Sequence, residues 1–255
     1  LRWFHDGDGQ LRLETGVWHL SNADADADAV AGVTLVPGQV PLLHLLADVK
    51  GDHIERAGAY LPSRKMPAAL TDWLQRALIG GRLTSGRFLY EGPVHIDPLR
   101  QQDRTFQMEF AVADAGLQFM PDWPALQGLV GKVLVDGHRV YGRDLSGVIY
   151  NSHFTKTDFD VWEDEPSMLP KLLVSAWVNG QADDINKLLH DSFMAKDLPG
   201  ELKDWQLSQG KVNGNLLLQL ALKHAPGVPP RVVVQANMSQ VKVAGAQRKE
   251  MYDKD

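Results

Sequence analysis

The sequence predicts a mainly β protein built on an antiparallel sheet with one apolar face and one polar face, interrupted by a few short helices. Apolar residues alternate in two stretches: Phe106, Met108, Phe110 and Val112, and again from Val212 to Leu222. Alternation with period two places these side chains on one face of a strand. The intervening residues are mixed or polar, which is typical of an antiparallel sheet with one dry side and one wet side.

Strands are predicted along most of the chain. Near the N-terminus, Asp6-Gly7-Asp8-Gly9 separates the runs 2–5 and 10–13, which predicts a hairpin because Gly supplies the positive φ of a tight turn. The further predicted strands are 33–36, 54–60, 86–92, 105–113, 131–135, 140–150, 154–161, 172–178, 210–222, 231–238 and 241–243. Similar helix, glycine and strand patterns around Gly81 and Gly210 favour a sheet that grows by repeats.

Three helices are predicted between the strands. The first, 67–79, has Pro at its first turn and Gly80-Gly81 after its end. The second runs over 183–190 with Asp183 as its N-cap. The third, 124–130, follows Trp123-Pro124, a pair that is expected to form either a corner between two strands or part of the core. Three narrow helical stripes cannot cover ten strands, so either two sheets cover each other or the dry face is left for another apolar group.

Composition excludes several functional classes. The chain has 255 residues, of which 44% are hydrophobic and 23% charged, and its net charge is −6. An acidic chain is not drawn to phosphate backbones, so a nucleic-acid partner is not expected. The absence of cysteine excludes disulfides, thiolate metal sites and thiol nucleophiles. The chain begins with Leu and shows no signal peptide or apolar run of membrane-spanning length, so it is expected to be one piece of a longer protein.

Three stretches carry a family resemblance: AYLPSRKMPAALTDWLQRALIGGRLTSGRFLYEG, then FQMEFAVADAGLQFMPDWPALQGLVGKVLVDGHRVYG, then VSAWVNGQADDINKLLHDSF. The order is Tyr-Leu-Pro, a helix with a central Trp-Leu, a strand that ends in an aromatic before Trp-Pro, and a Gly before a later helix. In this order the chain resembles the large AsmA-like YhdP proteins of Gram-negative bacteria, most clearly over residues 57–222. His95-Ile96-Asp97-Pro98 and Ser192-Phe193 depart from the family pattern, which affects loop geometry more than fold.

The resemblance implies a strongly bent antiparallel sheet that forms an open, repeating β-groove, of which residues 1–255 are one segment. It implies a periplasmic location within a protein anchored in the inner membrane. It further implies a passive hydrophobic conduit for phospholipid transfer between the inner and outer membranes, with flanking groove segments as neighbours. The expected lining residues, which would contact acyl chains, are Phe106, Met108, Phe110, Val112, Leu117, Phe119, Val133, Val135, Leu172, Val174, Leu216, Leu218, Leu220 and Leu222.

No enzyme, cofactor or metal site is expected from the residues. The nine histidines show no spacing that aims two imidazoles at one metal. Asp6 and Asp8 resemble the start of a calcium loop, but Leu11 and Val17 stand where its Gly and Glu are required. The clusters Asp24-Asp26-Asp28 and Glu163-Asp164-Glu165 leave a carbohydrate-acting enzyme as a minor alternative. Alternating Asp residues are more typical of a solvated rim that discourages edge pairing.

The main alternative is a closed β-sandwich that acts as a scaffold or protein-binding domain. In that fold, the same apolar stripes would form the core between two sheets. An open sheet would instead leave its terminal strands unpaired, so a fragment of a groove is expected to self-associate through its edges.

Overall fold

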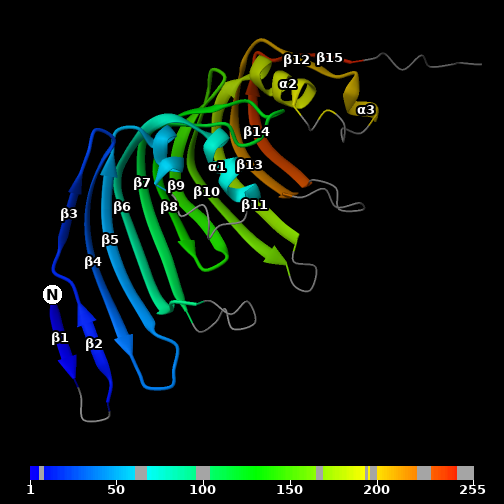
Figure 1. Cartoon of the computed structure of the whole chain (residues 1–255). Helices are drawn as coiled ribbons and strands as arrows, with labels where there is room; N and C mark the ends of the chain where they lie inside the picture. The colour runs from blue at the N-terminus through cyan, green and yellow to red at the C-terminus, as the bar shows by residue number, and fades with distance from the viewer. Residues whose placement is uncertain are drawn as a thin grey trace, which may run out of the picture.

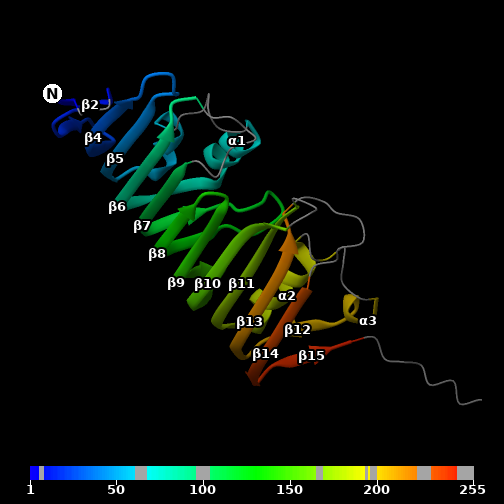
Figure 2. The same ribbon diagram turned by 90° about the horizontal axis from the view of Figure 1, so that it is seen from below.

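The computed structural model describes residues 1–5, 9–60, 68–95, 104–164, 169–192, 195, 200–222 and 231–245. Thirteen of the described strands form one antiparallel sheet, in which nearly every strand pairs with its neighbours in sequence. The path through the sheet is β1-β2-β4-β5-β6-β7-β8-β9-β10-β11-β13-β14, and β3 pairs with β4 beside β2. Figures 1 and 2 show these strands side by side as an open, curved sheet.

The strands of the sheet are β1 (Arg2–His5), β2 (Leu11–Glu14), β3 (Trp18–Ser21), β4 (Ala25–Leu35), β5 (Leu42–Gly51), β6 (Leu78–Pro93), β7 (Thr105–Leu117), β8 (Leu126–Asp136), β9 (Arg139–Ile149), β10 (Ser152–Asp164), β11 (Leu169–Gln181), β13 (Lys211–Ala221) and β14 (Arg231–Ser239). A separate pair joins β12 (Gln206–Ser208) to β15 (Lys242–Ala244).

The helices gather along one rim of the sheet. They are the 3₁₀-helix η1 (Ile54–Ala59) and the α-helices α1 (Ala68–Ala77), α2 (Ala182–Asp191) and α3 (Gly200–Lys203). Each lies in a connection at the same ends of the strands, which we call the helix rim, at the top of Figure 1. The opposite ends, the hairpin rim, carry the connections from β4 to β5 and from β8 to β9.

A belt of irregular pairings crosses the strands near the helix rim. The register shifts between Val112 and Ala115 on β7, between Gln127 and Val130 on β8, and between Phe154 and Thr157 on β10. Three non-glycine residues next to these shifts, Asp114, Asp144 and Lys156, have a left-handed φ of 54°, 53° and 46°. Bulges add a residue to one strand and bend it. The aligned bulges therefore account for the bend of the sheet between the two rims.

Gly81 shows why the belt needs glycine on β6. Its φ is +112°, and a Cβ there would lie 2.5 Å from the Cα of Ala115 on β7. The two backbones therefore approach more closely than any side chain allows. This contact draws β6 and β7 together at the bend.

Two hydrophobic clusters lie on the face that carries the helices. The first joins Ile54 of η1 to buried Ala115, Leu129 and Phe154 near the helix rim. The second contains buried Leu172, Leu218 and Leu220 on β11 and β13. No large side chain among the described residues is fully buried. Within the described part of the chain, the sheet therefore has one apolar face with local cover and no second layer that encloses it.

The mainly β class, the antiparallel sheet, its open form and the few short helices are as predicted. The closed sandwich alternative is wrong, because the described strands of the main sheet form a single path whose two ends, β1 and β14, do not pair with each other. The N-terminal hairpin is confirmed by the pairing of β1 with β2. Residues 6–8 of its turn lie outside the described residues.

Several predicted elements are wrong. Residues 54–60 form η1 and not a strand, because this segment leaves the sheet to cover it with Ile54. Residues 124–130 form no helix: a turn at 121–122 is followed by β8, which begins at Leu126. The N-cap of α2 is Gln181 and not Asp183, because the helix begins at Ala182. The strands β3, β5 and β12 and the helix α3 were not predicted.

Candidate functional site: an apolar floor on one face of the sheet

The register aligns apolar side chains from neighbouring strands in rows that cross the sheet. One row consists of Ala29, Ala47, Phe88, Met108, Val135, Val140, Val161, Leu172 and Leu220. A parallel row consists of Ala27, Val49, Gly86, Phe110, Val133, Gly142, Phe159, Val174, Leu218 and Val232. Directly paired residues point to the same face. These two rows, which we call the floor, form an unbroken apolar surface from β4 to β13 and, in the second row, to β14.

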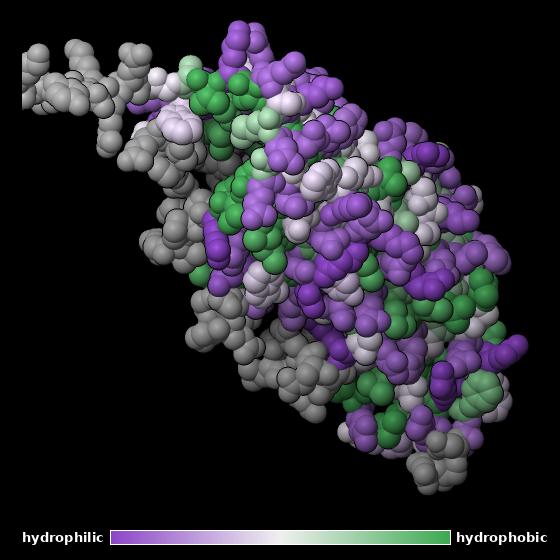
Figure 3. Space-filling model, turned by 180° about the vertical axis from the view of Figure 1, so that it is seen from behind, coloured by the Kyte–Doolittle hydropathy of each residue, from purple (hydrophilic) through white to green (hydrophobic). Residues whose placement is uncertain are grey.

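The row between them points to the opposite face and has another character. It consists of Asp28, Asp48, Arg87, Glu109, Leu134, Tyr141, Asp160, Leu173, Gln219 and Arg231. Figure 3 shows the side away from α1, where hydrophilic residues predominate. A one-residue step along any strand therefore exchanges an apolar environment for a mainly polar one.

Ion pairs connect neighbouring strands on this polar face. Arg87 Nε lies 2.8 Å from Asp48 Oδ1, and Lys132 Nζ lies 3.1 Å from Glu109 Oε1. The carboxylate of Asp48 accepts a hydrogen bond from Arg87 and raises the pKa of the guanidinium. Exposed pairs of this kind contribute little to the free energy of folding. Their effect is to keep one face of an open sheet hydrated.

Of the fourteen predicted lining residues, eight lie in the two floor rows: Met108, Phe110, Val133, Val135, Leu172, Val174, Leu218 and Leu220. Four more extend the same face. Phe106 pairs with Tyr90, Leu216 pairs with Ala176, and Val112 and Leu117 pack against the first hydrophobic cluster. Leu222 follows the end of β13 and packs on the second cluster. Phe119 lies off the strands, in the loop before β8.

Sequence reasoning missed the floor on β4, β5, β6, β9, β10 and β14. Ala25 to Asp28 alternates Ala with Asp, and this pattern is a strand whose small side chains face the floor, not only an acidic rim. Phe159 and Val161 fell within a predicted strand, but no face was assigned to them. On β9 a strand was predicted, but its floor face was not recognised. Gly142 has no side chain and occupies a floor position beneath the ring of Phe159.

One loop crosses the floor. Residues 118–125, which we call the bridge loop, connect β7 to β8. Its aromatic side chains Phe119 and Trp123 pack on the second hydrophobic cluster, whose members lie on β11 and β13. In the sheet, β9 and β10 separate β8 from β11. With strands about 4.8 Å apart, the loop reaches across roughly 14–19 Å of the floor.

Hydrogen bonds fix the shape of the bridge loop. The side-chain amide of Gln118 donates to the carbonyl oxygens of Met120 and Trp123, at 2.6 and 2.5 Å. The indole of Trp73 on α1 donates to the carbonyl oxygen of Phe119 at 2.9 Å, and the two rings meet edge to face. The backbone N–H of Gln118 donates to Ala77 at the end of α1. The loop is thus anchored to the helix rim.

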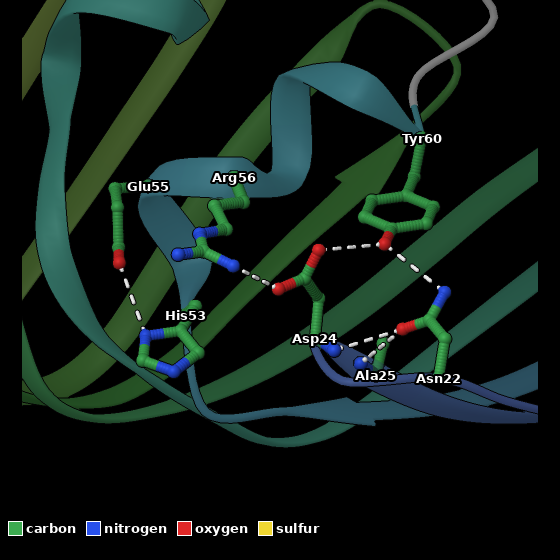
Figure 4. Close-up of polar contacts among 7 residues, drawn as sticks. All are labelled: Asn22, Asp24, Ala25, His53, Glu55, Arg56 and Tyr60. Atoms are coloured by element: carbon green, nitrogen blue, oxygen red, sulfur yellow. Dashed lines mark hydrogen bonds and ion pairs between the residues drawn. The ribbon is translucent and has the colours of Figure 1, made fainter.

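A polar network anchors η1 to the start of β4 (Figure 4). Asp24 accepts hydrogen bonds from the guanidinium of Arg56 at 2.5 Å and from the hydroxyl of Tyr60 at 2.9 Å. These two bonds, the Arg56 bond foremost, hold the pKa of Asp24 below its ordinary value. Asn22 donates to the same tyrosine and accepts from the backbone of residues 24 and 25. The network explains Asp24 structurally, so the carbohydrate-acting alternative loses its main support.

The other acidic positions give no catalytic arrangement in the described part of the chain. Asp26 accepts from Ser21, and Asp28 pairs with His19 on the neighbouring β3. Glu163 and Asp164 end β10 at the hairpin rim, and Glu165 lies outside the described residues. Among the residues that the structure describes, no helix is both long and apolar enough to span a membrane.

Fold and floor together define a mainly β protein whose large sheet is open and amphipathic. The family model described as YhdP protein matches residues 1–247, and the chain therefore belongs to the YhdP family. The chain is 28% identical over 186 residues to the intermembrane phospholipid transporter YhdP of Escherichia coli (strain K12). This match covers 71% of the chain but 14% of that relative. No solved structure is significantly similar to the chain.

Proposed function

We propose that this chain is one segment of a passive hydrophobic conduit that carries phospholipid acyl chains along the floor. The longer protein would be anchored in the inner membrane and would pass lipid through the periplasm to the outer membrane of a Gram-negative envelope. Support at the family level comes from the relative named as an intermembrane phospholipid transporter. The single observation that carries the proposal for this chain is the unbroken apolar floor, most of which is only half-buried.

Exposed apolar surface of this extent is unusual in a soluble monomer, where the largest patch is about 300–600 Å². Each methylene that leaves water contributes about 0.8 kcal/mol, so a sixteen-carbon acyl chain crossing water faces a barrier of about 12 kcal/mol. An apolar floor lowers this barrier at each step. A single open face also leaves the polar headgroup in water, so the conduit needs no pocket that recognises the headgroup.

The dimensions of the floor support the same function. The floor crosses ten strands, from β4 to β14, and at about 4.8 Å between strands it extends for roughly 43 Å. An acyl chain spans half of a bilayer core that is about 30 Å thick. The floor is therefore several times longer than the part of a lipid that it has to shield.

The ends of the sheet support a longer conduit. Among the described strands, β1 and β14 each pair on one side only, so each offers an edge to a further strand. On β14, Val232 and Val234 continue the floor face and are exposed. Flanking segments of the same kind would extend both the sheet and the floor, and these segments are the neighbours that we propose for this chain.

Native mass spectrometry of the protein purified from cells tests this function. We expect bound phospholipid in the wild type and its loss in Phe110→Asp and in Val133→Asp, because a charge on the floor at β7 or β8 repels acyl chains. Leu134→Asp is the matched control, since Leu134 is adjacent to Val133 on the same strand but points to the polar face. It should keep its lipid.

Equal lipid loading in all four proteins would contradict the proposal. Circular dichroism of each variant separates loss of binding from loss of the fold. Phe110, Val133 and Leu134 are all half-buried, so the three changes are comparable in their effect on the fold.

A further inference from the structure

The bridge loop occupies the part of the floor that an acyl chain would need. Along most of the floor the side chains are half-buried, but Leu172, Leu218 and Leu220 are only 6–7% exposed. Among the described side chains that pack on them, two large rings, Phe119 and Trp123, belong to the loop itself. Aromatic side chains of this size each bury about 150–250 Å². A lipid tail and these two rings would therefore compete for one surface.

The way in which the loop is held makes this competition possible. The hydrogen bonds described for its backbone and for Gln118 run to α1 and within the loop, through Trp73, Ala77 and the amide of Gln118. Phe119 and Trp123 pack on β11 and β13 through the apolar surface of their rings. Apolar contact has no direction, so an acyl chain can take the place of the rings on the floor. The anchored ends keep the loop close to the floor when the rings are displaced.

We propose that the bridge loop is a gate within the conduit: Phe119 and Trp123 fill the floor at β11 and β13 when no lipid is present, and an arriving acyl chain displaces them. The floor before the loop, on β5 to β8, is open to acyl chains at all times. The floor beneath the loop is open only when the loop lifts. This inference rests on the proposed function, because it concerns regulation of the same surface.

The test uses phosphatidylcholine that carries a photoreactive diazirine in one acyl tail, presented in vesicles to the purified 255-residue chain. After irradiation, mass spectrometry locates the labelled peptides. In the wild type we expect labels on β7 and β8, around Phe110 and Val133, and at least fivefold fewer on β11 and β13. In the double variant Phe119→Ser and Trp123→Ser, labelling of β11 and β13 should rise at least fivefold.

A second variant retains both rings. Gln118→Ala removes the amide that fixes the loop through Met120 and Trp123, so it should raise labelling beneath the loop by a smaller factor. Labelling of β7 and β8 is the internal control and should stay constant in all three proteins. The comparison of the two floor regions in the wild type remains informative even if a variant fails to fold.

Two results would overturn the gate, and they are distinguishable. Equal labelling of β7–β8 and β11–β13 in the wild type would contradict the gate and leave the conduit intact. Absence of labels from both regions, in the wild type and in both variants, would contradict the conduit itself and the gate with it.

Discussion

The indole N–H of Trp73 donates a hydrogen bond to the backbone carbonyl oxygen of Phe119, which lies 46 positions later in the chain. This bond joins α1 to the bridge loop and fixes where the loop crosses the floor. The two rings also meet edge to face, with centroids 6.3 Å apart. One helix at the rim therefore determines the position of an aromatic loop above β11 and β13.

Replacing Trp73 tests whether its hydrogen bond to Phe119 holds the bridge loop in place. Trp73→Phe retains an aromatic ring but removes the donor, so we expect the loop to loosen and the free energy of unfolding to fall by about 0.5–1.5 kcal/mol. Hydrogen exchange of residues 118–125 should become faster while exchange on β7 stays unchanged. Unchanged exchange throughout the loop would show that the indole bond does not hold it.

A buried carboxylate is expected to hold α2 on the sheet. Asp184 accepts hydrogen bonds from Ser152 Oγ at 2.7 Å and from the backbone N–H and side-chain amide of Asn151 at 3.0 and 3.3 Å. Asp184→Ala leaves these donors without an acceptor, so urea unfolding should show a loss of about 1.5–3 kcal/mol. Asp183→Ala is the control, because Asp183 is exposed and accepts a single bond, from Gln209. A similar loss in both variants would contradict this role of Asp184.

The network around Asp24 predicts a pH dependence at low pH. Since its pKa is lower in the folded chain than in the unfolded one, the stabilisation is present above the unfolded pKa and is lost as pH falls through the folded pKa. Protonation removes the charge that accepts from Arg56, so the protection factors of the η1 amides, which are corrected for the intrinsic pH dependence of exchange, should fall as the pH drops below about 3.8. In Asp24→Asn, these protection factors should not change over that range. The same pH response in both proteins would assign it to another group.

The free edges predict self-association of this chain. β14 exposes Val232, Val234 and Met238, and β1 exposes Trp3 and Phe4. Sedimentation velocity should show association that increases with concentration, and Val234→Lys should reduce it because charged residues protect an edge. Val30→Lys is the control, since Val30 is exposed but lies on β4, inside the sheet. A monomer at every concentration would contradict open edges.

Sequence patterns predicted the sheet well where alternation is strict. On β7 and β13, Phe106 to Val112 and Val212 to Leu220 define their face without any knowledge of their partners. Once one face is apolar, register follows, because a slip of one residue would expose the whole row. The floor residues on these strands were therefore predictable from local sequence.

The bend and the cover of the floor were not predictable in the same way. The bulges at Asp114, Asp144 and Lys156 depend on how neighbouring strands pair, and no local signal marks these residues. Residues 124–130, which form the end of the bridge loop and the start of β8, were expected as a short helix because Pro124 and the apolar residues after it are consistent with a helix start. The side chain of Trp123 instead packs on the hydrophobic cluster of β11 and β13, which is distant in sequence. This tertiary contact overrides local helix propensity.

Site-specific photo-crosslinking tests the central claim most directly. Benzoylphenylalanine would be placed in turn at Phe110 on the floor and at Leu134 on the polar face, in the full-length protein in intact cells. The two positions lie on adjacent strands and differ chiefly in the face that they occupy. We predict crosslinked phospholipid from position 110 and none from position 134. Equal crosslinking from both positions, or from neither, would contradict a conduit that carries acyl chains along the floor.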